Sequence, residues 1–168
     1  MPSTRLPVRT AAPSLVDPRG PRLGAALTTV VLAVALATGW VWLLALQAVV
    51  FALGAAGRSP YGVLYARLVR PRLGPSPELE DTRPLRFAQA VGLAFTLVAL
   101  AGLAAPTGVV TLVATAFALA AAFLNAAFGV CLGCEAYLLL RRATSSAPIA
   151  RTVPNPRAAT PTRTEVPA

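Results

Sequence analysis

Two cysteines are the residues of this sequence most able to do chemistry. Cys131 and Cys134 lie in the run Gly129-Val-Cys-Leu-Gly-Cys-Glu135, and the chain has no other cysteine and no histidine. C-x-x-C spacing lets two thiols meet across one helical turn. If Cys131 caps a helix, the partial positive charge of the backbone N–H groups stabilises its thiolate, which is the form that disulfide exchange needs. Glu135 is close enough to relay a proton or to raise a thiol pKa by repulsion.

Three roles for this pair stay open. It can be a redox-active dithiol that exchanges with a thioredoxin-like or sulfur-transferring partner. It can be structural, with two small thiols packed between helices. It can bind a metal, although two thiolates without histidine leave a tetrahedral site half empty unless a second chain completes it. No catalytic residue can be assigned. Motifs for phosphates, nucleotides, zinc proteases and nucleophile elbows are absent from the sequence, so we expect no cofactor and no enzymatic activity by this chain alone.

The composition indicates an integral membrane protein. Hydrophobic residues make up 56% of the chain, and the mean hydropathy is +0.66. Only 12% of the residues are charged, about half the usual fraction of a soluble domain. The net charge of +9 comes from arginines that flank apolar blocks and do not alternate with aromatic residues. We therefore expect no nucleic-acid binding. The pattern fits the positive-inside rule and contact with the lipid bilayer.

The first apolar block, Leu23 to Ala56, has no ionisable residue. One helix of this length would measure about 50 Å, whereas the hydrocarbon core of a bilayer measures about 30 Å. A turn at Thr38-Gly39 divides the block into predicted spans 24–38 and 40–56. Arginines stand on both sides of the block, and two crossings keep them on one side of the membrane. Trp40 and Trp42 then lie at the outer interface.

The second apolar block, Phe87 to Leu140, contains one charge, Glu135. Proline and glycine in Ala105-Pro-Thr-Gly108 predict a break between spans 86–104 and 109–128. The prediction is a multi-pass protein of the plasma membrane with its N-terminus, central loop and C-terminus in the cytoplasm. Residues 1–16 and 143–168 are predicted to be disordered tails on either side of a membrane domain, 17–142.

The two blocks share flanking patterns. Asp17, Arg19 and Arg22 form a D-x-R-x-x-R motif that returns 64 residues later as Asp81, Arg83 and Arg86. The ends of the blocks match at an offset of 72 residues, which pairs Cys131 with Ser59 and Cys134 with Gly62. These matches predict an all-α fold of four transmembrane helices, arranged as two hairpins in a parallel pseudo-repeat. An amphipathic interfacial helix follows each hairpin, at 59–72 and 130–142. The six motif residues would be topology anchors. Chance similarity between Ala/Leu-rich stretches is the alternative.

These motifs also carry a resemblance to a known family. The relevant runs are Asp17-Pro-Arg-Gly-Pro-Arg22, Arg58-Ser-Pro60, Glu80-Asp-Thr-Arg-Pro-Leu-Arg-Phe87 and Asn125-Ala-Ala-Phe-Gly-Val-Cys-Leu-Gly-Cys-Glu135. They resemble an uncharacterised bacterial membrane family, domain of unknown function 4395, over about residues 14–142. The resemblance implies a small multi-span protein, often actinobacterial, that is loosely associated with thioredoxin-type or rhodanese-type genomic neighbours. It implies no catalytic residue.

Two functional hypotheses follow. In the first, the chain is a membrane thiol-redox or sulfur-handling component that works through Cys131 and Cys134 with a thioredoxin-like or rhodanese-like sulfurtransferase partner. In the second, it is a non-enzymatic membrane module or small-solute permease with structural cysteines. Association into a homo-oligomer is compatible with both.

Overall fold

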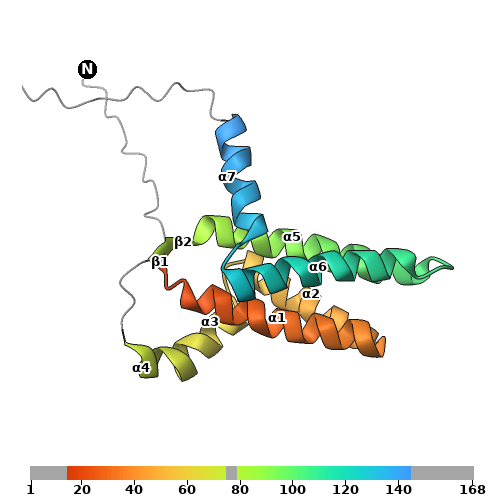
Figure 1. Cartoon of the computed structure of the whole chain (residues 1–168), viewed down its shortest axis with the longest axis horizontal. Helices are drawn as coiled ribbons and strands as arrows, with labels where there is room; N and C mark the ends of the chain where they lie inside the picture. Colours follow the sequence, from red (N-terminus) through yellow and green to blue (C-terminus); the bar gives the residue numbers. More distant parts are fainter. Residues whose placement is uncertain (1–14, 75–78, 145–168) are drawn as a thin grey trace, which may run out of the picture.

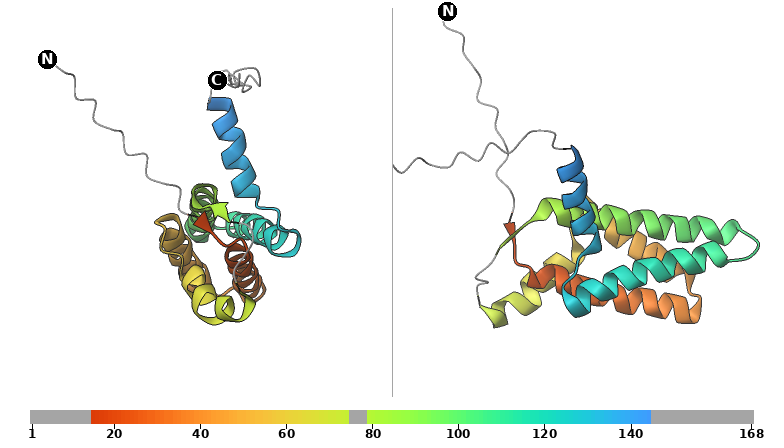
Figure 2. Two further views of the ribbon diagram at one scale, coloured as in Figure 1. Left: turned by 90° about the vertical axis from the view of Figure 1, so that its left-hand side faces the viewer. Right: turned by 45° about the horizontal axis from the view of Figure 1, so that its top comes forward.

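The computed structural model describes residues 15–74 and 79–144, and nearly all of them are helical (Figures 1 and 2). The long helices are α1 (Arg19–Thr38), α2 (Val41–Ala55), α5 (Thr82–Ala101, continued by a 3₁₀ turn at Gly102–Ala104), α6 (Val109–Phe128) and α7 (Leu132–Thr144). Shorter elements are α3 (Pro60–Leu64), a π-helical turn (Tyr65–Val69), α4 (Arg70–Leu73) and the strands β1 (Leu15–Val16) and β2 (Glu80–Asp81).

Three helices are long and apolar enough to cross a membrane: α1, α5 with its 3₁₀ extension, and α6. Helix α2 has 15 residues and a length of about 22 Å, short of a hydrocarbon core of about 30 Å. It passes the same test jointly with Pro60–Leu73, to which it is bent by 79°. In the part of the chain that the structure describes, the fold is therefore mainly helical, with three helices able to span a bilayer, or four if the bent pair counts as one span.

Both breaks that the sequence predicts within the apolar blocks are present. Gly39 has a φ of 70° and ends α1 by donating its N–H to the carbonyl of Ala35. Gly108 has a φ of 61° and starts α6 after the segment around Pro106. Left-handed backbone of this kind favours glycine. Trp40 and Trp42 are exposed beside the first turn.

The four long helices of the bundle pack mainly across the two hairpins. Helix α1 lies against α6, and α2 lies against α5. Leu32, Ala99 and Ala118 are buried where they meet. Small residues permit this close packing: a Cβ on Gly92 of α5 would lie 2.7 Å from the Phe51 ring of α2. The bundle thus forms one core shared by both hairpins.

A chain of polar side chains links the middle of α1 and α2 to α3. Gln47 donates from Nε2 to Thr28 Oγ1 at 3.2 Å, and the Tyr61 hydroxyl donates to Gln47 Oε1 at 3.1 Å. Such bonds satisfy polar groups that would be costly to leave unpaired in an apolar interior. Gln47 thus joins α1, α2 and α3 through hydrogen bonds.

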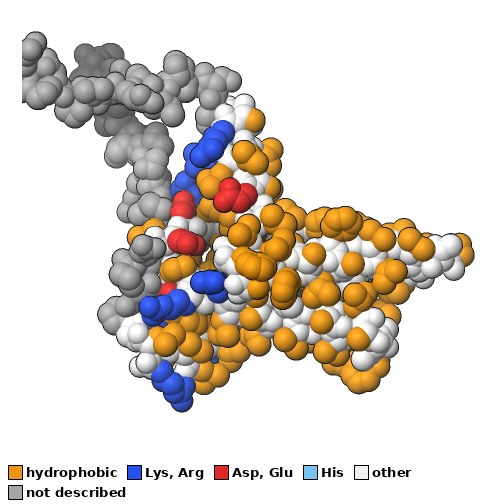
Figure 3. Space-filling view, viewed as in Figure 1, with side chains coloured by type: hydrophobic (Ala, Val, Ile, Leu, Met, Phe, Trp, Pro, Cys, Tyr) orange, Lys and Arg blue, Asp and Glu red, His pale blue; other side chains and the backbone are white. Residues whose placement is uncertain are grey.

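The charged residues gather at one end of the bundle. In Figure 3 they lie on the side of the strands and α4, and on α7, whereas the flank of the bundle is apolar. The opposite end carries the turn at Gly39 and the break before Gly108, and residues 23–56 and 87–134 on either side of these breaks contain no charge. Exposed large hydrophobic side chains cover the long helices between these ends. This surface suits contact with lipid more than with water.

The strands β1 and β2 are a feature that the sequence analysis did not predict. Leu15 pairs with Asp81, and Val16 pairs with Glu80, in an antiparallel arrangement. The predicted disordered tail, 1–16, thus included two residues that are paired in the structure; the rest of that tail, and residues 145–168 of the C-terminal one, lie outside the described residues. The reason is tertiary: two residues are too few to show a strand pattern, and the pairing joins segments far apart in the chain.

The helical segments after each hairpin are not parallel to the long helices of the bundle. The run from Pro60 to Leu73 turns away from α2, and α7 projects steeply from the bundle (Figures 1 and 2). The π-helical turn precedes Pro71, which lacks the N–H that an α-helical turn would need. Helix α7 begins two residues later than the predicted segment 130–142 and continues to Thr144.

Candidate functional site

The first cysteine caps helix α7. The chain leaves α6 at Gly129, whose φ is 72°, and α7 begins at Leu132. The Sγ of Cys131 accepts a hydrogen bond from the backbone N–H of Cys134 at 3.3 Å, and the Cys131 carbonyl accepts one from Glu135 at 3.0 Å. The thiol therefore faces the positive end of the helix dipole, which favours its thiolate.

The two thiols have different proton affinities. The hydrogen bond from the Cys134 thiol lowers the pKa of Cys131 to about 7; burial opposes this shift, and the backbone N–H groups of Cys134 and Gly133 reinforce it. The pKa of Cys134 is raised by the same contact, by burial and by nearby negative charge. Near neutral pH, these pKa shifts favour a thiolate at Cys131 and a protonated thiol at Cys134.

Two carboxylates act on the pair electrostatically. Glu135 is exposed in the first turn of α7, and its charge is among the smaller causes that raise the pKa of Cys134. Glu80 of β2 raises the pKa of both cysteines in the same way. Sequence reasoning missed Glu80 as a site residue, because only the pairing of β2 with β1 brings it to this end of α7.

A cavity of about 300 Å³ exposes both cysteines at the charged end of the bundle. Three segments form it: β1 with the start of α1, β2 with the start of α5, and the junction of α6 and α7. Its lining comprises Val16, Pro18, Pro21, Arg22, Glu80, Asp81, Pro84, Leu85, Asn125, Gly129, Cys131, Cys134 and Leu138. Arginine, carboxylates and thiols therefore share one solvent-accessible recess.

The aspartates of the two D-x-R-x-x-R motifs accept hydrogen bonds at helix N-termini: Asp81 is the N-cap of α5, and Asp17 directly precedes Pro18, the N-cap of α1. The Oδ1 of Asp17 accepts a hydrogen bond from the N–H of Arg19 at 3.0 Å, and the Oδ1 of Asp81 accepts one from the N–H of Arg83 at 3.0 Å. Asp17 also accepts from the Tyr65 hydroxyl at 2.7 Å. The spacing of the motif thus reflects the need of a helix N-terminus for an acceptor.

The last arginines of the motifs reach across to the other hairpin. A Cβ on Gly129 would lie 3.5 Å from the guanidinium carbon of Arg22. A Cβ on Gly57 would lie 3.6 Å from the guanidinium carbon of Arg86. Arg86 also donates from Nε to the carbonyl of Ala55 at 2.9 Å. Each arginine therefore sits at the C-terminal end of a helix, where a positive charge is stabilising.

Of these six motif residues, the structure brings Arg22 and Asp81 into the cavity with the cysteines, whereas Asp17, Arg19, Arg83 and Arg86 lie outside its lining.

The equivalent position in the first half has the same cap without sulfur. Ser59 Oγ accepts from the N–H of Gly62 at 3.2 Å, and the Ser59 carbonyl accepts from Val63 at 3.1 Å. The sequence offset pairs Ser59 with Cys131 and Gly62 with Cys134. The same backbone arrangement thus forms with a serine hydroxyl as with a cysteine thiol. Only the second half has thiols at these positions.

A metal-binding reading gains no additional ligands from the structure. In the described ranges, no group of three or more His, Cys, Asp or Glu side chains is arranged to hold a metal ion. Both cysteines are free thiols and half-buried. What the arrangement can do chemically is nucleophilic attack by Cys131, with Cys134 close enough to resolve the product.

Comparison with known proteins adds one match. A family profile described as "Domain of unknown function (DUF4395)" matches residues 16–142. Neither the curated proteins nor the solved structures include one that matches this chain.

Proposed function

The chain belongs to the family of domain of unknown function 4395, and from that premise we propose that it is a multi-pass membrane protein that exchanges disulfides with a thioredoxin-like or rhodanese-like partner. Cys131 and Cys134 are its reactive pair. The observation that carries the proposal is the cap of α7: the Cys131 sulfur accepts the Cys134 N–H at 3.3 Å inside a cavity that both thiols line.

The exchange uses the pair in two steps. The Cys131 thiolate attacks one sulfur of the partner's disulfide, which forms a mixed disulfide and releases the partner's other sulfur as a thiolate. Cys134 loses its proton to that thiolate and attacks Cys131 Sγ, which closes the Cys131–Cys134 disulfide and releases the partner's first sulfur. The reaction is reversible, and the two reduction potentials set its direction.

The membrane arrangement in this proposal has four crossings, with α2 as the short second span. Its packing along α5 and the exposed Trp40 and Trp42 at its start support this reading. The charged end, with the cysteine pair, faces the cytoplasm of the cell, since arginines accumulate on that side. A soluble cytoplasmic partner could then reach the cavity.

A duplicated hairpin is part of the same proposal. Val16 and Glu80, which are equivalent at an offset of 64 residues, pair with each other in the antiparallel strands. The contacts Arg22–Gly129 and Arg86–Gly57 also exchange, with the arginines equivalent at the offset of 64 and the glycines at the offset of 72 that relates the block ends. Reciprocal contacts of this kind support a pseudo-two-fold axis along the membrane normal.

A trapping experiment tests the proposed exchange. In Cys134→Ser the resolving thiol is gone, so native membranes should accumulate a mixed disulfide between Cys131 and a soluble partner. Cys131→Ser keeps the capping geometry, as Ser59 shows, but should trap nothing. If both cysteines stay reduced in the wild type and both variants trap no partner, the exchange function is wrong.

A small-solute permease is the second candidate, and one observation favours it. Two cavities along the bundle share lining residues, as a permeation route would require. In that case the cysteines are structural. Replacement of both by serine would then leave the cellular phenotype unchanged, whereas the exchange function would be lost.

A further inference from the structure

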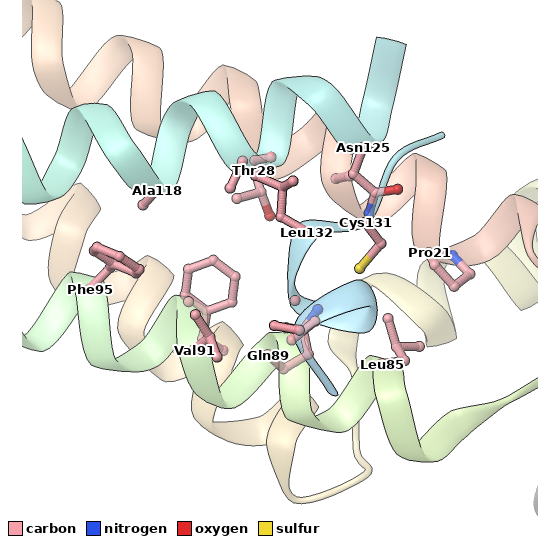
Figure 4. A pocket seen from close by; sticks show the side chains of 18 of the residues that line it. Pro21, Thr28, Leu85, Gln89, Val91, Phe95, Ala118, Asn125, Cys131 and Leu132 are labelled. Carbon is pink, nitrogen blue, oxygen red and sulfur yellow. The ribbon is translucent and has the colours of Figure 1, made fainter. Parts of the chain in front are cut away.

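A second cavity, of about 240 Å³, lies beside the first and reaches into the apolar part of the bundle. The two cavities have Pro21, Leu85, Asn125 and Cys131 in common. Figure 4 shows the Cys131 sulfur pointing into this space near Leu85. Cys134 lines the cavity at the charged end but not the apolar one. The nucleophilic sulfur is therefore the one that can be reached from both sides.

The apolar cavity extends to the outer surface of the helices. Phe95 and Phe117 line it, with their rings stacked at 6.3 Å between centroids. The side chain of Phe117 is 62% exposed and that of Phe95 is 38% exposed, on a surface that suits contact with lipid. A ligand could thus enter from the hydrocarbon core without crossing water.

The lining limits the chemistry of such a ligand. None of the residues that line the apolar cavity is charged, so it does not suit a nucleotide or an ionic solute. Its volume is near the lower end of ligand pockets, which suits a single ring system. Gln89 and Asn125 are among its lining residues, and amide N–H groups donate hydrogen bonds to carbonyl oxygens.

We propose that a lipophilic quinone enters the apolar cavity from the bilayer and oxidises the Cys131–Cys134 dithiol. This inference rests on the proposed exchange function and names its second substrate. A quinone combines an apolar ring, two carbonyl acceptors and the capacity to take up two electrons. An acyl chain would fill the same apolar volume, but it would make no use of the adjacent thiol or of the amides.

The two electrons pass from the sulfurs to the quinone, and the protons come from Cys134 and from water. The Cys131 thiolate adds to the quinone ring, and the Cys134 thiol loses its proton and attacks Cys131 Sγ. The carbon–sulfur bond breaks as the sulfur–sulfur bond forms, and two electrons remain on the ring. The proton from Cys134 and one from water, which received the proton of Cys131 when that thiol ionised, convert the two ring oxygens to hydroxyls. The dithiol thus becomes a disulfide and the quinone becomes a quinol. A reduced partner then attacks Cys131 of the disulfide and regenerates the dithiol.

The test uses the full chain, reduced and reconstituted in lipid nanodiscs without oxygen. The probe is decylubiquinone, whose fully substituted ring cannot permanently alkylate a thiol. Wild-type protein should form quinol and Cys131–Cys134 disulfide in equal amounts. A water-soluble aromatic disulfide, added in a parallel reaction, reports thiol exchange independently of the quinone.

Variants on α6 distinguish the cavity from the rest of the surface. Ala121→Phe fills the cavity and should slow quinone reduction by about tenfold or more, while exchange with the aromatic disulfide keeps its wild-type rate. Ala120→Phe changes an exposed neighbour outside the lining and should have no effect on either rate. Ala122→Leu, a smaller filling of the same cavity, replaces Ala121→Phe if that variant does not fold.

Each outcome decides between the two ideas. If the wild type exchanges with the aromatic disulfide but leaves the quinone oxidised, the quinone inference is overturned and the exchange function stands. Equal quinone reduction by wild type and both cavity variants also overturns it, as does displacement of a bound acyl chain without quinol formation. Failure of both reactions removes the exchange function and the inference with it.

Discussion

Gly133, between the two cysteines, lies directly against Ala88 of α5. A Cβ on Gly133 would be only 2.6 Å from both the Cα and the Cβ of Ala88. A glycine at this position lets the start of α7 approach α5 closely. Because Cys131 and Cys134 flank this contact, it also fixes where both thiols lie relative to the two cavities.

Gly133→Ala should therefore disturb the site by overpacking. The added methyl group must displace α7 or α5, and we expect the free energy of unfolding to fall by about 1–3 kcal/mol. The pKa of Cys131 should rise because its hydrogen bonds depend on the position of α7. Denaturant titration in detergent and alkylation rates measure the two effects. Gly24→Ala is the control, because a Cβ on Gly24 would lie 3.5 Å from its nearest neighbour, Tyr61, which is an ordinary van der Waals distance. Equal stability of wild type and Gly133→Ala would contradict the close approach.

Reactivity of Cys131 should depend on pH as expected for a thiol of lowered pKa. The thiolate fraction increases as pH rises through the pKa, so alkylation by iodoacetamide should be half-maximal near pH 7, where the pKa of Cys131 lies. An ordinary cysteine reaches this point at about pH 8.5. Cys134→Ala removes the main hydrogen-bond donor and should shift the midpoint upward. Mass spectrometry of the alkylated peptide provides the rates. An unchanged midpoint in Cys134→Ala would show that the hydrogen bond from Cys134 does not lower the pKa of Cys131.

Comparison of Gly129→Ala with Gly39→Ala distinguishes a loss of stability caused by backbone strain from a change in the reactivity of Cys131. Both glycines have a left-handed backbone conformation, with φ values of 72° and 70°. Alanine should cost each about 1–2 kcal/mol of stability. Gly39 is at the far turn with nothing within 4 Å, whereas Gly129 leads into Cys131 and contacts Arg22. Only Gly129→Ala should change the alkylation rate of Cys131. A similar change in Gly39→Ala would show that the rate reports general destabilisation.

The four-crossing arrangement predicts a definite sidedness. Reporter fusions after Trp40, Pro75 and Ala150 should report outside, inside and inside. The physical reason is that arginines at both flanks of each apolar block resist export. Matched labelling of single cysteines at the same positions in a Cys131→Ser/Cys134→Ser background provides an independent measurement. An outside location after Pro75 would mean that α2 does not complete a second crossing.

Several features of the fold could be predicted because their signals are local. Hydropathy blocks need no knowledge of packing, and Gly39 and Gly108 mark breaks through the backbone conformations that glycine permits. The span predicted at 109–128 matches the bounds of α6, whereas α1 and α5 start earlier than predicted at 24 and 86. The earlier starts follow from Asp17 and Asp81, whose capping bonds draw arginines into the first helical turn.

By itself, the sequence determined that the chain has helices apolar enough to span a membrane, where its apolar blocks break and which two residues can do thiol chemistry. Composition and neighbouring residues suffice for these statements. Only the tertiary structure decided that Cys131 is the activated thiol, that Glu80 lies nearby, and that one sulfur lines two cavities. The physical reason is that these properties depend on contacts between β2, α5 and α7. Local sequence patterns do not specify how such distant segments meet.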